Sequence, residues 1–277
     1  MEIAPGVHSI PMPTWTFMGI YGPNVYLVVG KEAALIDSGF ESREAARSRE
    51  EYIKGLAPLK LAYIIITHPH PDHIGGCRAI QKATGAPIVM HSLAADRARG
   101  DYGIAADILV EDNDVLDIGG IHLEIIYTPG HSPASICVYV KESKILFTGD
   151  HILGIGTTVV DAPDGDMTQY IDSLKKLLKY DISMICPGHG PPIYEAERKI
   201  KELIAHRRER ERQVMFSLRQ GRKTVARLVA EIYPELDPRL LELARRQVLA
   251  HLRKLVRENK VAVAGEEYVL TRGNPKP

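Results

Sequence analysis

Thr67-His68-Pro69-His70-Pro71-Asp72-His73 closes the apolar run that begins at Leu61, and this stretch indicates both the fold and the chemistry. The run is short, continuous and rich in β-branched residues, as in a strand buried on both faces of a sheet. His68 and His70 each precede a proline, which favours extended backbone, and alternate residues of extended backbone point to one side. Both imidazoles can therefore share one metal ion, whereas a turn into a helix at Asp72 directs Asp72 and His73 toward a second position.

Three later segments each place a potential ligand beside glycine at the end of a predicted strand. They are Thr128-Pro129-Gly130-His131-Ser132, Thr148-Gly149-Asp150-His151 and Cys186-Pro187-Gly188-His189-Gly190. Glycine lets the backbone turn sharply and approach a site closely. Seven ligands are too many for one tetrahedral ion and suit two ions bridged by a carboxylate. Imidazoles and carboxylates without thiolates favour two Zn²⁺ ions, with Fe and Mn as alternatives. The candidate ligands are His68, His70, Asp72, His73, His131, Asp150 and His189.

Each of these residues also has a purely structural interpretation when taken alone. Asp72 is typical of a helix N-cap, and a single loop histidine is usually solvated. His91, His122 and His151 lie outside the pattern, and we expect them to be structural or solvated, although His151 is adjacent to Asp150. Only the dense grouping of ligand types after one buried strand favours a metal site.

The 277 residues, 45% of them hydrophobic, are enough for two domains or one large one. Strands and helices alternate irregularly before residue 195, which predicts an α/β fold with two sheets covered by helices on their outer faces. Residues 24–36 are typical of a β-hairpin. The other predicted strands are 61–67, 87–90, 121–127, 136–140, 145–148 and 184–186, and the predicted helices are 41–55, 72–84 and 168–179.

Residues after Pro192 have a different pattern, with long polar helices predicted at 195–220, 224–233 and 237–258 and a hairpin at 261–270. Helices that close with a β-hairpin are typical of a winged helix. We therefore expect a catalytic domain at 1–195 and a small, basic, winged-helix-like domain at 196–277. A helical cap over the first domain is the alternative.

The formal net charge of zero hides an asymmetry. Residues 198–277 contain twenty Lys and Arg against ten Asp and Glu, whereas residues 1–197 contain fifteen against twenty-five. The acidic part can hold cations and the basic part can bind polyanions, or the two parts can simply present solvated faces.

The three cysteines are far apart in the sequence and form no C-x-x-C pair, which argues against disulfides and favours a reducing cytoplasm. Residues 1–10 lack the pattern of an export signal, and no run approaches the roughly 20 apolar residues of a membrane span. We expect a cytoplasmic protein with no membrane partner.

H-x-H-x-D-H, followed by His in T-P-G-H-S, Asp in T-G-D and His in P-G-H-G, resembles the metallo-β-lactamase superfamily over residues 1 to about 195. The resemblance implies a four-layer αββα sandwich and a hydrolase that uses a metal-bridging hydroxide, with Asp72 able to manage the proton. Asp37 resembles the family's support for the ligand loop, although its spacing equally suits a turn-forming residue. The family pattern places His68, His70 and His131 on one metal, Asp72, His73 and His189 on the other, and Asp150 between them.

Departures from related patterns narrow the group. His70 stands where flavodiiron proteins have Glu, which argues against that class. The 38 residues between Asp150 and His189 are too few for the inserted domain of the β-CASP nucleases. Classical β-lactamases generally have Cys where this chain has Asp150, which argues against that class as well. The winged-helix-like tail and Gly154-Ile155-Gly156-Thr157-Thr158-Val159 resemble the β-lactamase-like protein 2 group.

That group includes an endoribonuclease that acts on single-stranded RNA, so we favour metal-dependent phosphodiester hydrolysis with a single-stranded nucleic acid as substrate. A glyoxalase II-like thioesterase or acyl hydrolase that acts on a small-molecule ester or thioester is the alternative, with the tail as an acyl groove or a homodimer contact. A DNA-binding regulator with a metal sensor is a third hypothesis, which the complete ligand set disfavours.

Overall fold

The computed structural model describes residues 1–10, 22–42, 47, 49, 51–53, 55 and 59–271. Contacts within the chain divide it into two compact units. One contains residues 1–129, 133–158 and 179–197, and the other contains residues 130–132, 159–178 and the chain from Arg198 onward. The expected domain boundary at residue 195 stays a prediction, and most of the helix expected at 41–55 lies outside the described residues.

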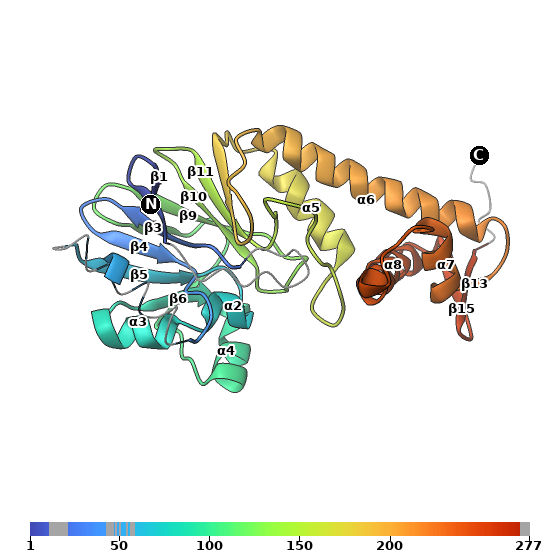
Figure 1. Cartoon of the computed structure of the whole chain (residues 1–277), viewed down its shortest axis with the longest axis horizontal. Coiled ribbons are helices and arrows are strands. Elements are labelled where there is room, and N and C mark those ends of the chain that lie inside the picture. The colour runs from blue at the N-terminus through green and yellow to red at the C-terminus, as the bar shows by residue number, and fades with distance from the viewer. Residues whose placement is uncertain are drawn as a thin grey trace. The chain divides into compact units, whose positions relative to one another are not determined.

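The first unit begins with a seven-stranded sheet whose strand order follows the chain (Figure 1). The pairings from β1 to β4 are antiparallel and those from β4 to β7 are parallel. The hairpin expected at 24–36 is confirmed as β3 paired with β4. The strands are β1 Glu2–Ala4, β2 Val7–Ile10, β3 Val25–Val29, β4 Ala33–Ile36, β5 Leu61–Ile66, β6 Ile88–His91 and β7 Ile108–Val110.

A second sheet of five strands has the order β12-β11-β10-β9-β8. β11 and β12 are parallel, so these two strands end at the same edge of the sheet. The other pairings in this sheet are antiparallel. The strands are β8 Val115–Asp117, β9 His122–Tyr127, β10 Ile136–Val140, β11 Ile145–Gly149 and β12 Met184–Pro187.

Period-two alternation gives the first sheet two apolar faces. Ile36 and Ile65 pack in one core with Phe147 of the second sheet, whereas Leu35 and Ile64 belong to the core formed with α3 Cys77–Thr84 and α4 Ala95–Tyr102. Figure 1 shows α3 and α4 on the side of the first sheet away from β9–β11. Each fully buried Ile or Leu contributes about 1.5–3 kcal/mol. The α/β class with two facing sheets is thus confirmed.

The single helix expected at 72–84 is wrong, because the segment forms two helices, α2 Pro71–Ile74 and α3. Gly75 and Gly76 separate them where the backbone packs tightly on the segment after β4. A Cβ at Gly75 would lie 2.5 Å from the backbone N of Glu41, and one at Gly76 would collide with the carbonyl O of Ser38. The break lets the short α2 turn independently of α3.

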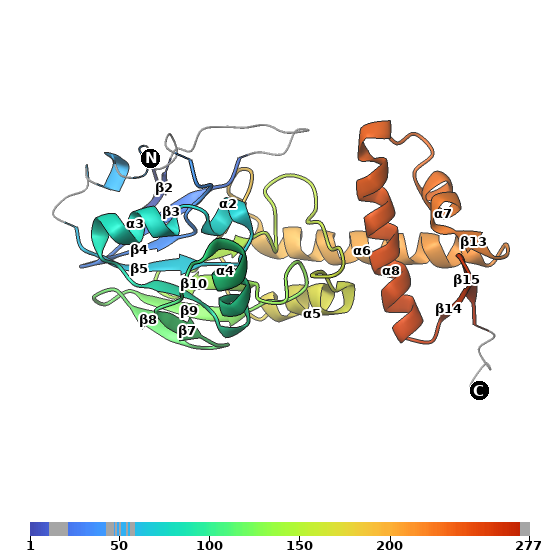
Figure 2. The ribbon, with the colours of Figure 1, turned by 90° about the horizontal axis from the view of Figure 1, so that it is seen from below.

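The second unit contains α5 Met167–Leu177, most of α6 Ala196–Leu218, α7 Val225–Ile232, η2 Pro238–Leu240 and α8 Leu241–Arg257. A small sheet of order β13-β15-β14 closes it, with β13 Lys223–Thr224, β14 Val261–Ala264 and β15 Glu267–Leu270. Figure 2 shows α8 crossing α6, where Arg207 donates to Gln247 over 2.7 Å. The winged-helix-like arrangement is confirmed. None of the described helices is long and apolar enough to cross a membrane.

Candidate metal centre

Strand ends carry the predicted ligands. His68 and His70 follow β5, Asp150 follows β11 and His189 follows β12. The ends of β11 and β12 lie together, since the Gly188 N–H donates to the Gly149 carbonyl over 2.7 Å. Extended backbone at His70 precedes α2, which carries Asp72 and His73 into the same region.

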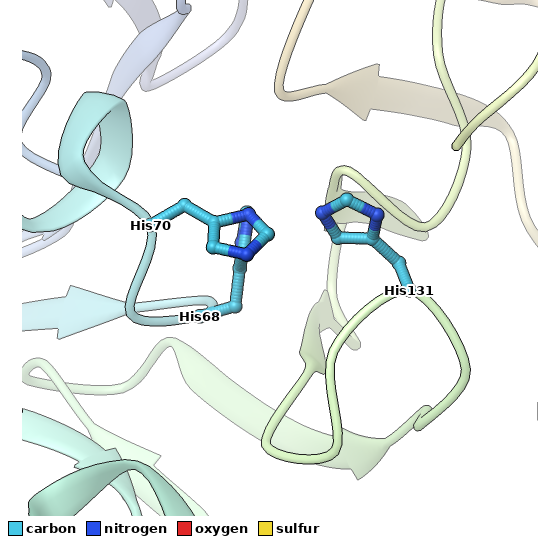
Figure 3. A group of neighbouring side chains, drawn as sticks. All are labelled: His68, His70 and His131. Carbon is cyan, nitrogen blue, oxygen red and sulfur yellow. The ribbon is translucent and has the colours of Figure 1, made fainter. Parts of the chain in front are cut away.

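His68, His70 and His131 form a group whose ligand atoms lie within 4.8 Å of one another (Figure 3). Nε2 of His68 lies 2.9 Å from Nδ1 of His70. Nδ1 of His131 donates to the carbonyl O of Val159 over 2.7 Å, which places the lone pair of that ring on Nε2. This hydrogen bond fixes the tautomer that a metal ligand requires.

Two further groups contain the other predicted ligands. Asp72, His73 and His189 form one of them, with Nε2 of His189 3.1 Å from Oδ2 of Asp72. Asp150 groups with His68 and His73. His68 is an expected ligand of the first metal and His73 an expected ligand of the second. Its Oδ1 lies 3.4 Å from Nε2 of His73 and 3.4 Å from Nε2 of His189. All seven predicted residues therefore occur in these overlapping groups, and their role as metal ligands stays a prediction.

Asp37 holds both ends of the ligand loop, residues 67–73, by hydrogen bonds from its carboxylate. Its Oδ1 accepts the backbone N–H of Thr67 over 2.8 Å, and its Oδ2 lies 2.9 Å from the Thr67 hydroxyl and 2.7 Å from Nδ1 of His73. Next to it, the Ser38 hydroxyl donates to the His73 carbonyl over 2.7 Å. The orientation of His73, with Nε2 directed toward Asp72 and Asp150, follows from these bonds.

Electrostatics at the centre favour bound cations. Burial disfavours the charged form of His73, but the carboxylates of Asp37 and Asp150 raise the pKa of His73 well above its ordinary value. Burial also opposes ionisation of Asp150, yet the imidazoles of His73 and His189 hold the pKa of Asp150 well below its usual range. The pKa of Asp72 is lowered by the same two imidazoles, again against burial.

The surroundings of Nε2 of His73 show whether these residues fit a divalent metal ion. This atom is buried and makes no hydrogen bond to any described residue, although two carboxylates lie within 4 Å. A buried nitrogen without a hydrogen-bond partner is costly, and a divalent ion supplies the missing partner while neutralising the carboxylates. Imidazole and carboxylate donors together are the set that Zn²⁺ accepts in open sites, so the residues fit the expected metals.

Asn24 and Tyr26 support the His189 loop, and the sequence alone indicated neither residue. The Asn24 side-chain amide donates to the carbonyls of Pro187 and Gly190 over 2.9 and 2.7 Å, and the Tyr26 hydroxyl donates to Pro187 over 2.9 Å. More than 160 residues separate donor and acceptor in each case. No local pattern could have indicated these contacts.

Histidines outside the pattern have structural surroundings, as expected. His91 is buried and stacks on Tyr127 with ring centroids 4.4 Å apart. His122 is exposed and lies 2.6 Å from Glu142, and His151 is buried. None of the three belongs to a ligand group of the described residues.

Replacing Asp37 by asparagine is expected to weaken metal binding about 10- to 100-fold, because loss of a partner that orients a ligand typically has that effect. A zinc titration against a competing chromophoric chelator measures the change. Asp117→Asn is the control, since Asp117 accepts backbone N–H groups in an exposed turn. Equal affinity in wild type and Asp37→Asn would show that Asp37 only forms the turn.

Comparison with known proteins adds independent findings. The family described as "Metallo-beta-lactamase superfamily" matches residues 18–189, and "Beta-lactamase associated winged helix domain" matches residues 224–268. The chain is 30% identical over 246 residues to the Beta-lactamase-like protein 2 homolog of Caenorhabditis elegans, covering 87% of this chain and 81% of the relative. It is 32% identical over 206 residues to an atrochrysone carboxyl ACP thioesterase of Aspergillus fumigatus, covering 73% of this chain and 61% of the relative.

Solved structures share the fold at low sequence identity. A Beta-lactamase domain protein from Burkholderia ambifaria has a TM-score of 0.84 at 21% identity, covering 98% of this chain and 93% of the other. A metallo-beta-lactamase family protein from Thermus thermophilus has a TM-score of 0.78 at 24% identity, covering 98% and 100%. These two likenesses extend over both the sheets and the C-terminal helices.

Proposed function

The chain belongs to the metallo-beta-lactamase superfamily, and on that premise we propose that this hydrolase holds two zinc ions and cleaves thioesters or related acyl substrates. The observation that carries the reaction class is the set of three overlapping ligand groups, with Asp150 grouped with His68 and His73. Two divalent ions, when bound in such a site, lower the pKa of a shared water and polarise a substrate carbonyl.

Asp72 is the residue best suited to move a proton. Its side chain is 22% exposed, whereas that of His73 is fully buried. Its carboxylate is ionised near neutral pH, as aspartates ordinarily are, and can accept a proton from the attacking water. Passing that proton to the leaving group completes hydrolysis without a covalent intermediate.

An acyl substrate is supported by the charge of the loops that carry the ligands. The chain has 35 Lys and Arg, yet residues 37–42, 67–76, 128–135, 149–166 and 187–195 contain none. The same loops contain several Asp and Glu besides the ligands. A phosphate backbone is normally bound by Lys and Arg, whereas a neutral ester or thioester has no need of them.

Apolar side chains are exposed beside two of these loops. Phe40 is 41% exposed, and its backbone packs on Gly75, two residues after His73. Ile155 is 53% exposed, and its backbone lies against Gly190, the residue after His189. Exposed apolar groups at the entrance of a polar site favour a substrate with an apolar part. The Aspergillus relative is named as an ACP thioesterase, which agrees with this proposal.

Hydrolysis of single-stranded RNA, which the sequence alone favoured, is the second candidate, and a surface on and directly after α6 supports it. Arg208 and Phe216 are exposed on this helix, Arg219 is exposed directly after its last residue, and neither arginine forms an ion pair with any described residue. Phe216 also lines a groove of about 700 Å³ between α6 and α7. An aromatic ring between free guanidinium groups can stack a base and bind phosphates.

A substrate panel tests the proposal on the zinc-loaded protein. We expect turnover of S-lactoylglutathione or an acyl-CoA, abolished by chelation and restored by zinc, and no cleavage of labelled single-stranded RNA. Metal-dependent RNA cleavage without thioester turnover would select the nuclease instead, and activity on neither class would contradict both candidates.

Ile155→Asp is expected to reduce kcat/KM about tenfold for a long-chain acyl-CoA and much less for acetyl-CoA, because apolar contacts discriminate by roughly 1–3 kcal/mol. Leu109→Asp is the control, since Leu109 is exposed to a similar degree on β7. An equal effect on both chain lengths would count against acyl binding at Ile155.

A further inference from the structure

We infer that Arg257, the last residue of α8, positions His131 through Asp166 and so belongs to the apparatus of the metal centre. This inference rests on the proposed function, because it takes His131 to be a metal ligand. The supporting contacts form a short path from His131 through residues 159–170 to α8.

The His131 loop is bonded to residues 159–166 at two points. Nδ1 of His131 donates to the Val159 carbonyl over 2.7 Å, and the backbone N–H of Asp166 donates to the Gly130 carbonyl over 2.9 Å. The direction of the His131 ring therefore depends on where the segment from Val159 to Asp166 lies.

Gly130 also packs directly on the first turn of α5. It has φ of +138°, and a Cβ at this position would collide with the backbone of Tyr170. Tyr170 is fully buried, and its N–H donates to the Asp166 carbonyl over 2.9 Å. A shift of Asp166 would therefore move both the Gly130 carbonyl and the surface on which Gly130 rests.

The Asp166 carboxylate uses its two oxygens for different purposes. Oδ1 caps α5 by accepting the N–H groups of Thr168 and Gln169 over 2.8 and 3.1 Å. Oδ2 accepts a hydrogen bond from Nη1 of Arg257. The contact to Arg257 can thus be removed while the helix cap is kept.

Other arginines of the C-terminal helices contact the same segment. Nη1 of Arg246 on α8 lies 3.5 Å from Asp161, and the guanidinium of Arg207 on α6 lies 5.1 Å from the centre of the Tyr170 ring. Part of the positive charge of residues 198–277 is thus used to hold the segment that fixes His131, and is not available to an external polyanion.

Arg257→Gln tests the inference in the full-length, zinc-loaded protein. We expect the affinity for the zinc ion that His131 would hold with His68 and His70 to fall about tenfold, the lower end of the effect of residues that orient a metal ligand. A competing chromophoric chelator measures the affinity, and the absorption spectrum of the cobalt-substituted protein reports the altered ligand geometry. Arg257→Lys keeps the charge and should retain most of the affinity.

Asp166→Asn should reproduce the effect, because asparagine keeps the Oδ1 cap and loses the charge. If both residues act through one contact, the double variant should be no weaker than either single variant. Arg253→Gln is the matched control, since Arg253 lies one turn earlier on α8, is exposed and forms no ion pair with any described residue.

A lower melting temperature with unchanged zinc affinity and cobalt spectrum would overturn the inference, because Arg257 would then only stabilise the fold. Equal zinc affinity in wild type and Arg257→Gln overturns only the inference about Arg257 and leaves the proposed function intact. A wild-type protein that binds no divalent metal overturns the proposed function, and this inference with it.

Discussion

Asp150→Asn is expected to lower kcat/KM by about 10³-fold while the protein remains folded. Asp150 is the carboxylate that groups with both His68 and His73, and His189 lies 3.4 Å from the same oxygen. A metal ion that polarises the substrate oxygen contributes several kcal/mol of transition-state stabilisation, and each 1.36 kcal/mol in the barrier is a factor of about ten in rate, so impaired metal binding lowers the rate by this order. Asparagine has almost the same volume, so the loss reports the charge and not the packing.

Metal content separates this effect from a general loss of activity. We expect elemental analysis of Asp150→Asn to find fewer than the two ions proposed for wild type, because an amide is a poor substitute for a bridging carboxylate. Asp181→Asn is the control, since Asp181 pairs with Lys144 at an exposed position. Two retained ions together with wild-type turnover would contradict the placement of Asp150 between the metals.

Sequence patterns predicted which seven residues gather in the three groups, because local rules determine where those residues occur. A buried strand with a known end places His68 and His70, and the same rule applies to Asp150 after β11 and His189 after β12. Placing these residues required no knowledge of distant contacts, because each follows the last residue of a predicted strand, β5 in the first sheet and β11 and β12 in the second.

Supporting contacts were less predictable, because they depend on tertiary structure. Asp37 was ambiguous in the sequence, and only its bonds to Thr67 and His73 resolve its role. Asn24 reaches a loop 163 residues away and has no local signature. The break at Gly75 and Gly76 similarly follows from packing against the segment after β4, whereas helical periodicity continues through it.

Short strands at sheet edges were also missed. β1, β7 and β8 have three residues each, too few to show period-two alternation. They complete the edges of the two sheets and carry none of the predicted ligands, so the site could be predicted without them.

Charge alone could not assign a role to the C-terminal residues. The excess of Lys and Arg there suggested a polyanion-binding surface, but Arg246 and Arg257 contact Asp161 and Asp166 within the same unit. Free guanidinium groups such as those of Arg208 and Arg219 are the part of that charge still available to an external partner. A test of RNA binding should therefore target α6 and not α8.

Gly188→Ala is expected to reduce activity by at least about 100-fold, although it adds a single methyl group. A Cβ at this position would lie 2.5 Å from Oδ1 of Asp150, 2.8 Å from Cε1 of His73 and 2.8 Å from the carbonyl C of Gly149. None of these atoms can move freely, because His73 is held by Asp37 and Gly149 is backbone at the end of β11. Displacing a reacting group by about 1 Å can cost about 100-fold in rate.

The same substitution should also lower the free energy of unfolding by about 1–3 kcal/mol, the usual range for overpacking a tight interior. Kinetics and thermal unfolding measure these two consequences on one sample, and a zinc titration of the same sample measures its metal content. Gly100→Ala is the matched control, because nothing lies within 4 Å of a Cβ there and alanine favours the helix α4. Since a Cβ at Gly188 would contact both a predicted bridging carboxylate and a predicted ligand of the second metal, full activity and metal content in Gly188→Ala would contradict the arrangement of the whole centre.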